Sequence, residues 1–224
     1  MMTSLFSMFD PTATAYIQIN WTNMMLSIMI TPILMWKSMS RNNFLLNLII
    51  TNLNKEFESL FNKNLLMKGS TLLMLSLFLF ILTNNITSNF PYTFCCSAHL
   101  CFSFALSLPI WLSIILFLWM NMNKSMFAHL VPTGTPNLLM PFMVLIELAS
   151  NLIRPMALSI RLTANLIAGH LLMALLGTTL NFHSNLWMLI LIIQMMFISF
   201  ELMIGLIQSY VFSVLMTLYS SEMS

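Results

Sequence analysis

Long runs of apolar residues dominate the chain, and charged residues are confined to a few places between them. Residues 69–123 contain no Asp, Glu, Lys or Arg, which is enough for two helices that each cross a bilayer core with ~20 apolar residues. A break at residues 89–92, Asn-Phe-Pro-Tyr, separates them, so we expect membrane helices at about 70–88 and 98–122. An earlier apolar segment, at about 16–36, predicts a first span. Alternation with a period of two is absent, which favours helices over a β-barrel.

Two longer apolar segments follow residue 137. They cover 138–176 and 186–219, so continuous helices there would measure about 58 and 51 Å at a rise of 1.5 Å per residue. Both lengths exceed the bilayer core, so each segment either breaks into two short spans or lies strongly tilted. Neither contains an internal loop, which favours two long tilted helices joined as a hairpin. Pro155 is the one obvious site for a kink.

The segment 44–61 has a different pattern. Its apolar residues keep a helical spacing, while Asn, Lys and Glu fill the remaining positions. This pattern is typical of a helix that lies in the membrane interface rather than across the bilayer. The sequence therefore predicts an all-α integral membrane protein, a single membrane domain over 1–224, with about five membrane helices and one interfacial amphipathic helix.

The composition excludes two broad classes of protein. Of the 224 residues, 59% are apolar and only 6% are charged, whereas soluble domains carry about 25% charged residues. A soluble enzyme is therefore excluded. The net charge of +2 comes from thinly spread cations without a basic patch, which also excludes nucleic-acid binding.

The cations predict the orientation in the membrane. Five of the eight lie between the first and second predicted spans: Lys37, Arg41, Lys55, Lys63 and Lys68. By the positive-inside rule, residues 37–68 and 123–137 face the inside and the N-terminus faces the outside.

A few charged and amide side chains lie inside the two long segments. The charged ones are Glu147, Arg154, Arg161 and Glu201, and the amides include Asn165 and Gln208. Glu147, Arg154 and Arg161 are seven residues apart in turn, so an uninterrupted helix places them on one face. An arginine at mid-membrane costs about 2.5 kcal/mol or more, so these groups need partners or a water-filled cavity. Two readings stay open for Glu147 and Arg154, namely an ion or proton path and a structural ion pair.

One compact cluster could suggest a metal site. Cys95, Cys96, His99 and Cys101 lie within seven residues, which is too compressed for easy tetrahedral closure around zinc. We expect buried free cysteines or an outer-side disulfide there, and neither a metal nor a cofactor. The chain also lacks a glycine-rich phosphate loop and a nucleophile–base motif, so we expect no catalysis by this chain itself.

The segment 154–165, RPMALSIRLTAN, followed by AGH at 168–170, resembles the signature of subunit a of rotary ATP synthases in its mitochondrial form. The stretches at 126–136, 207–212 and 218–221 agree with the resemblance, as does the start of the chain. Twenty-three methionines fit an animal mitochondrial genome, in which an extra codon is read as Met.

The resemblance implies a role in proton translocation. The family's essential arginine matches Arg161, which attracts the carboxylates of a ring of small subunits and separates two aqueous half-channels. Glu201 and His170 would line the intermembrane-space half-channel and Glu147 the matrix one, while Asn165 and Gln208 would orient Arg161 or hold channel water. Nine residues separate Arg161 from His170, so an ideal helix places them on opposite faces. His170 can equally be a packing histidine.

The resemblance also implies partners and a location. The expected partners are the c-ring, the peripheral stalk and other small Fo subunits, protons and membrane lipid. The expected location is the mitochondrial inner membrane, with the N-terminus in the intermembrane space and the 37–68 loop on the matrix side. The alternative is a structural membrane subunit of another respiratory complex. A self-contained channel is disfavoured, because the chain has no internal repeat and no pore ring.

Overall fold

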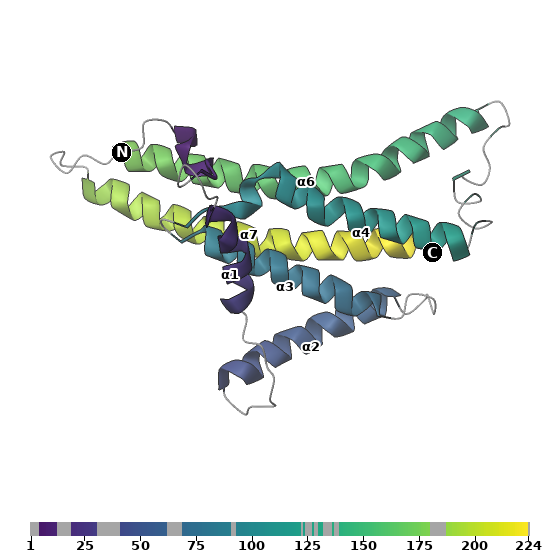
Figure 1. The fold of residues 1–224 in the computed structure, drawn as a ribbon, viewed down its shortest axis with the longest axis horizontal. Coiled ribbons are helices and arrows are strands. Elements are labelled where there is room, and N and C mark those ends of the chain that lie inside the picture. The colour runs from purple at the N-terminus through teal and green to yellow at the C-terminus, as the bar shows by residue number, and fades with distance from the viewer. Residues whose placement is uncertain are drawn as a thin grey trace.

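The computed structural model describes residues 5–12, 19–30, 41–61, 69–90, 93–121, 123, 127, 130–131, 136, 139–179 and 187–223. Within these residues every regular element is helical, as expected from the sequence (Figure 1). In chain order the elements are η1 (Leu5–Phe9), η2 (Ile19–Trp21), α1 (Thr22–Ile30), α2 (Arg41–Phe61), α3 (Ser70–Ser88), η3 (Cys96–Ala98), α4 (Leu100–Asn121), α6 (Met140–Thr179) and α7 (Trp187–Met223).

Four of the described helices are long and apolar enough to cross a membrane, namely α3, α4, α6 and α7. The bounds of α3 coincide with the predicted span 70–88, and α4 begins slightly later than predicted because η3 precedes it. The predicted first span at 16–36 is described only in part, as η2 and the nine-residue α1. Its residues 16–18 and 31–36 lie outside the described residues, so this span stays a prediction.

The two long apolar segments form two continuous helices. The 40 residues of α6 and the 37 residues of α7 correspond to about 60 and 55 Å at 1.5 Å per residue. The alternative in which each breaks into two spans is therefore wrong. The two helices run antiparallel and side by side (Figure 1). Figure 1 shows a bend in α6. Pro155 explains it, because this residue lies inside the helix and has no backbone N–H to donate to the carbonyl one turn earlier.

A stripe of small buried residues runs along α7, and its member Gly205 contacts α3. This stripe contains Gly205, Ser209, Ser213, Thr217 and Ser220. Small residues at helix interfaces permit close contact of the backbones inside a membrane. On this interface Asn85 of α3 donates from Nδ2 to the carbonyl oxygen of Gly205, at 3.2 Å. The hydrogen bond fixes how far along α7 the helix α3 sits.

The interface between α6 and α7 is mainly apolar. Its buried side chains include Leu158, Leu162 and Leu166 on α6 with Phe212 and Met216 on α7. The helix α4 packs mainly against α6.

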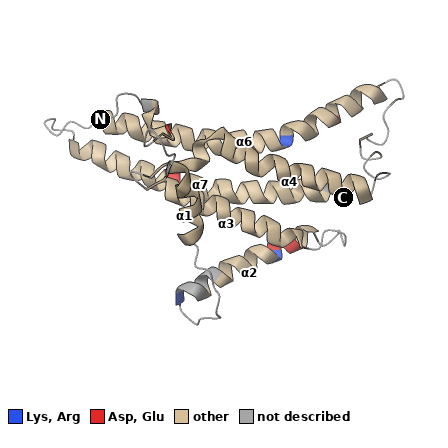
Figure 2. Cartoon of the chain, in the orientation of Figure 1, with Lys and Arg blue, Asp and Glu red and all other residues tan. Residues whose placement is uncertain are grey.

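Charged positions are sparse along α3, α4, α6 and α7, whereas α2 carries charges of both signs (Figure 2). Charged side chains on the long helices are therefore exceptions that need a specific environment.

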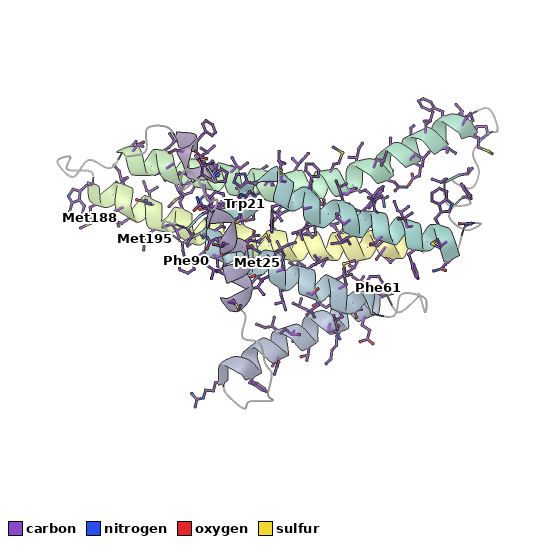
Figure 3. All side chains as sticks on the ribbon, in the orientation of Figure 1. Trp21, Met25, Phe61, Phe90, Met188 and Met195 are labelled. Atoms are coloured by element: carbon purple, nitrogen blue, oxygen red, sulfur yellow. The ribbon has the colours of Figure 1, made fainter. Side chains whose placement is uncertain are left out.

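The amphipathic helix α2 is anchored at its C-terminal end. Phe57 and Phe61 are buried there, and Figure 3 shows the place of Phe61 at this end of α2. The Tyr210 hydroxyl of α7 donates to Glu56 Oε2 at 3.3 Å. The other end of α2 extends away from the long helices (Figure 1), and Phe44 there is exposed. The described helix covers the predicted segment 44–61, and its position at the membrane surface stays a prediction.

Candidate functional site

Two amide side chains form a hydrogen bond between the long helices. Asn165 of α6 donates from Nδ2 to Oε1 of Gln208 on α7, at 3.2 Å. The Gln208 side chain is buried, and its Nε2 atom has no hydrogen-bond partner in the part of the chain that the structure describes. The structure thus brings together two of the site residues predicted from the sequence.

Arg161 lies one helical turn before Asn165 and is exposed on the surface of the chain. Its neighbours Leu158 and Leu162 are buried against α7 and α4 instead. Among the described residues, none of the acidic side chains forms an ion pair with Arg161. The guanidinium is therefore directed away from the packed interior and is accessible to a partner outside this chain.

Glu201 occupies a space that only a glycine leaves open. The Glu201 side chain is only 7% exposed, and its carboxyl group lies against Gly169 of α6. A Cβ atom added to Gly169 would overlap Oε1 of Glu201 and come within 2.7 Å of its Cδ. The Oε1 atom has no donor within the described ranges. A buried charge without hydrogen bonds is strongly unfavourable. The Oε1 atom of Glu201 can therefore still accept a hydrogen bond that none of the described residues donates.

His170 directly follows Gly169 and is partly buried. Its Nε2 atom is buried and has no partner among the described residues. Because α6 is continuous from Arg161 to His170, the nine-residue spacing places the two side chains on opposite faces, as the sequence predicted. The structure gives no ion pair between His170 and Glu201 in the described part, so both the channel reading and the packing reading remain.

Arg154 has an aromatic partner that the sequence did not reveal. Its Cζ atom lies 4.7 Å from the centroid of the Tyr219 ring of α7, within the range of a cation–π interaction. Glu147 is partly buried on the other side of Pro155 from Arg161. The bend at Pro155 therefore interrupts the single straight face that the spacing of Glu147, Arg154 and Arg161 predicted.

The two polar contacts between α6 and α7 share one register. From Arg154 to Asn165 is eleven residues, and from Gln208 to Tyr219 is also eleven. Eleven residues make three turns, about 16 Å along the axis. Arg161 lies between the two contacts, so both helices are held at points above and below it.

The cysteine cluster lies at the connection between α3 and α4. Cys95 and Cys96 are buried, Cys101 is exposed, and all three are free thiols, so the structure shows no disulfide there. Burial raises the pKa of Cys95 to about 11, against hydrogen bonds that lower it, the largest from Ser88. The described His, Cys, Asp and Glu residues include no group of three or more that could hold a metal ion.

Three features of the site were not found from the sequence, namely Gly169 beside Glu201, Tyr219 beside Arg154 and Asn85 beside Gly205. Each depends on the register between two helices, that is, on which of their residues lie at the same position along the helix axes. The small size of Gly169 inside a helix was a usable signal, because glycine there needs a packing reason. The partners of Arg154 and Asn85 had no comparable signal.

Together these observations define an all-helical integral membrane protein with a polar site built into an apolar pair of long antiparallel helices. The sequence model of the family described as ATP synthase A chain matches residues 11–221. ATP synthase subunit a of Locusta migratoria is 48% identical over 224 residues, covering 99% of both chains. The proteins of the same name from Drosophila yakuba and Anopheles gambiae are each 48% identical, over 225 and 227 residues, covering 100% of both chains. The chain belongs to the ATP synthase subunit a family, which argues against a structural subunit of another respiratory complex.

Proposed function

We propose that this chain is the stator subunit of a mitochondrial F-type ATP synthase that carries protons to and from a c-ring through two half-channels. The observation that carries the proposal is the exposed position of Arg161, which has no acidic partner among the described residues. A permanent cation on a membrane helix requires a counter-charge. A rotating ring of subunits, each with one membrane carboxylate, supplies that charge from outside the chain.

Arg161 has two roles in this proposal. Its fixed charge attracts a deprotonated ring carboxylate and favours the charged form of that carboxylate, so the proton leaves before the ring subunit passes. It also prevents a direct hop between the half-channels, because a proton would have to pass a permanent cation. A lysine would serve poorly, since a buried lysine can lose its proton and an arginine cannot.

The two half-channels use different parts of the helix pair. Glu201 and His170 serve the intermembrane-space path, which is supported by their unpartnered buried polar atoms. Glu147 serves the matrix path, beyond the bend at Pro155. A proton that reaches Glu201 is passed through water to a ring carboxylate, travels with the ring, and is released on the matrix side.

The amide pair positions Arg161. Because Nδ2 of Asn165 donates to Gln208, the Asn165 Oδ1 atom is free to accept from an N–H of the guanidinium one turn away. The buried Nε2 of Gln208 has no partner among the described residues and can hold a channel water. Asn165 and Gln208 are therefore positioning residues for the cation.

The proposal implies a location and partners. The chain spans the mitochondrial inner membrane with its N-terminus in the intermembrane space and residues 37–68 on the matrix side. Its partners are the c-ring, the peripheral stalk, other small Fo subunits and membrane lipid. ATP is formed on other subunits, and this chain binds no nucleic acid.

The deciding experiment replaces Arg161 in the assembled complex. Arg161→Ala should abolish proton-driven ATP synthesis without reducing the amount of complex, and Arg161→Lys should restore little of the activity. Arg41→Ala, which removes an exposed arginine of α2, is the matched control and should leave synthesis near normal. Normal synthesis in Arg161→Ala would refute the proposal.

The intermembrane-space path is tested separately through Glu201. Glu201→Gln keeps the size of the side chain and removes its ability to carry a proton. Passive proton conduction through Fo should fall, while Arg161 and the ring still bind. An unchanged conduction rate would remove Glu201 from the path.

A further inference from the structure

Two hydrogen bonds attach the segment formed by η2 and α1 to the connection between α3 and α4. Nδ2 of Asn23 donates to the carbonyl oxygen of Phe94 at 3.1 Å. The Cys96 thiol donates to the carbonyl oxygen of Asn20 at 3.9 Å. The bonded residues are 71 and 76 positions apart in the chain. The position of η2 and α1 therefore depends on the conformation of this connection.

An imidazole ring lies at the centre of this attachment. The His99 ring packs at tilted angles against Trp21 of η2 and against Phe94, with centroid distances of 5.3 and 5.2 Å, and the rings of Trp21 and Phe94 meet edge to face at 5.8 Å. His99 also forms a hydrogen bond with the backbone of Phe9, the last residue of η1. Because His99 directly precedes α4, one side chain joins η1, η2 and the start of α4. We call Phe9, Trp21, Phe94 and His99 the aromatic clasp.

The environment of His99 favours the neutral ring. Its Nε2 atom is buried and has no hydrogen-bond partner within the described part of the chain. A protonated imidazole donates from both nitrogens, so protonation would create a buried charge and a buried donor without an acceptor, which is unfavourable. Burial lowers the pKa of His99, against the hydrogen bond with Phe9, which raises it. The clasp is therefore most stable above about pH 6.5, the ordinary pKa of histidine, and loses stability as the pH falls below that value.

Few other groups near the clasp change charge in this range of pH. The elements η2, α1 and α3 contain no titratable residue. Asp10, which follows η1, is exposed, and its carboxylate already accepts two hydrogen bonds from Thr12. The helix α6 packs against η1 and η3 (Figure 1), and its titratable residue nearest to the C-terminal end is His170. The connection and the start of α4 add the thiols Cys95, Cys96 and Cys101. By their ordinary pKa values, only the two imidazoles change charge to a large extent between about pH 5 and 7.5.

We propose that the aromatic clasp is an acid-sensitive latch, which holds the N-terminal segment against the connection between α3 and α4 while His99 is neutral and releases it when His99 is protonated. The proton comes from a hydronium ion, which becomes water, and it forms an N–H bond on the His99 ring. Release breaks the hydrogen bond from Cys96 to Asn20 and exposes the Cys96 thiol. In the proposed orientation this end of the chain faces the intermembrane space. The latch does not require this chain to conduct protons, so it goes beyond the proposed function and can fail separately from it.

The test measures the accessibility of the Cys96 thiol as a function of pH in the intact ATP synthase in membrane vesicles. The reagent is dithiodipyridine, a disulfide that reacts with thiols in acid as well as at neutral pH. Cys95→Ser is the background variant, so that labelling at Cys96 is measured alone. Cys96 is 4% exposed, and the exposed Cys101 is the internal reference. The labelling rate of Cys96 relative to Cys101 should rise roughly tenfold from about pH 7.5 to about pH 5, which is about 1.4 kcal/mol in the opening equilibrium.

Two variants of the same background separate His99 from other causes of acid sensitivity. His99→Phe keeps an aromatic ring in the clasp and removes the titrating group, so the relative rate should stay low at both pH values. His170→Gln is the matched control, because it removes the other imidazole at this end, and the rise should persist. If His99→Phe does not assemble, His99→Gln replaces it with the same expected result.

Three outcomes would overturn the proposal. The first is a relative rate in the background variant that does not change with pH. The second is a rise that persists when His99 is replaced or disappears when only His170 is replaced. The third is a fall of the relative rate in acid, which would mean that the faces of Trp21 and Phe94 stabilise the imidazolium by cation–π interaction.

Discussion

Gly169 provides a sharp test of how closely α6 and α7 must meet at Glu201. An alanine there would place a methyl carbon 2.7 Å from Cδ and 3.0 Å from Cγ of Glu201, and in overlap with Oε1. Ordinary contact begins at about 3.4 Å, so the carboxyl carbon would have to move by about 0.7 Å and Cγ by about 0.4 Å. The end of a glutamate side chain can move that far, so the expected effect falls on the position of the carboxylate.

The balance of energies predicts a folded but impaired protein. Replacing glycine by alanine inside a helix gains about 1 kcal/mol from helix propensity, which offsets part of the 1–3 kcal/mol that overpacking typically costs. Assembly should therefore survive. A displacement approaching 1 Å in a proton-transfer group can lower a rate by up to about a hundredfold, so we expect proton conduction in Gly169→Ala to fall by about ten- to a hundredfold.

Passive proton conduction by Fo and proton-driven ATP synthesis are measured against the amount of assembled complex. Gly177→Ala is the matched control, because it lies on the same helix and a Cβ atom there meets nothing within 4 Å. Shortening the displaced side chain should relieve the clash, so Gly169→Ala combined with Glu201→Asp should conduct better than Gly169→Ala alone. Equal conduction in Gly169→Ala and Gly177→Ala would refute the reasoning.

Two further predictions concern other parts of the chain. Tyr219→Leu should lower the thermal stability of the complex and Tyr219→Phe should not, because phenylalanine keeps the ring face beneath Arg154; equal melting of both variants would contradict this. Iodoacetamide at pH 8 should alkylate the exposed Cys101 well before the buried Cys95, since a pKa of about 11 leaves only about one Cys95 thiol in a thousand ionised. Cys95 should react faster as the pH rises toward its pKa, and equal labelling at pH 8 would contradict the burial.

The helices themselves were predictable because their cause is local. In a bilayer only helices and closed β-barrels satisfy the backbone, and an apolar run without period-two alternation favours the helix. The uncharged stretch 69–123, with its break at 89–92, therefore predicted α3 and α4. The absence of an internal loop similarly predicted that 138–176 and 186–219 each form one helix. The bend in α6 followed from Pro155, which removes one backbone donor whatever the surroundings.

The contacts across the site were not predictable in the same way. The sequence singled out Arg161, Glu201, Asn165 and Gln208 because polar groups are rare in apolar segments, but it gave no register between the helices. The hydrogen bond from Asn165 to Gln208 depends on that register. Asn85 was passed over as part of an uncharged span, although it joins α3 to α7.

The sequence by itself determined that this chain is a helical membrane protein and which polar groups it keeps inside the membrane, because the free energy of burying a charge depends mainly on residue type. Only the tertiary structure decided which way those groups face. It placed Arg161 on the outer surface, buried Glu201 against Gly169, and joined Asn85 of α3 to Gly205 of α7. The physical reason is that helix register is fixed by packing between residues far apart in the chain, where small side chains and single hydrogen bonds set the alignment.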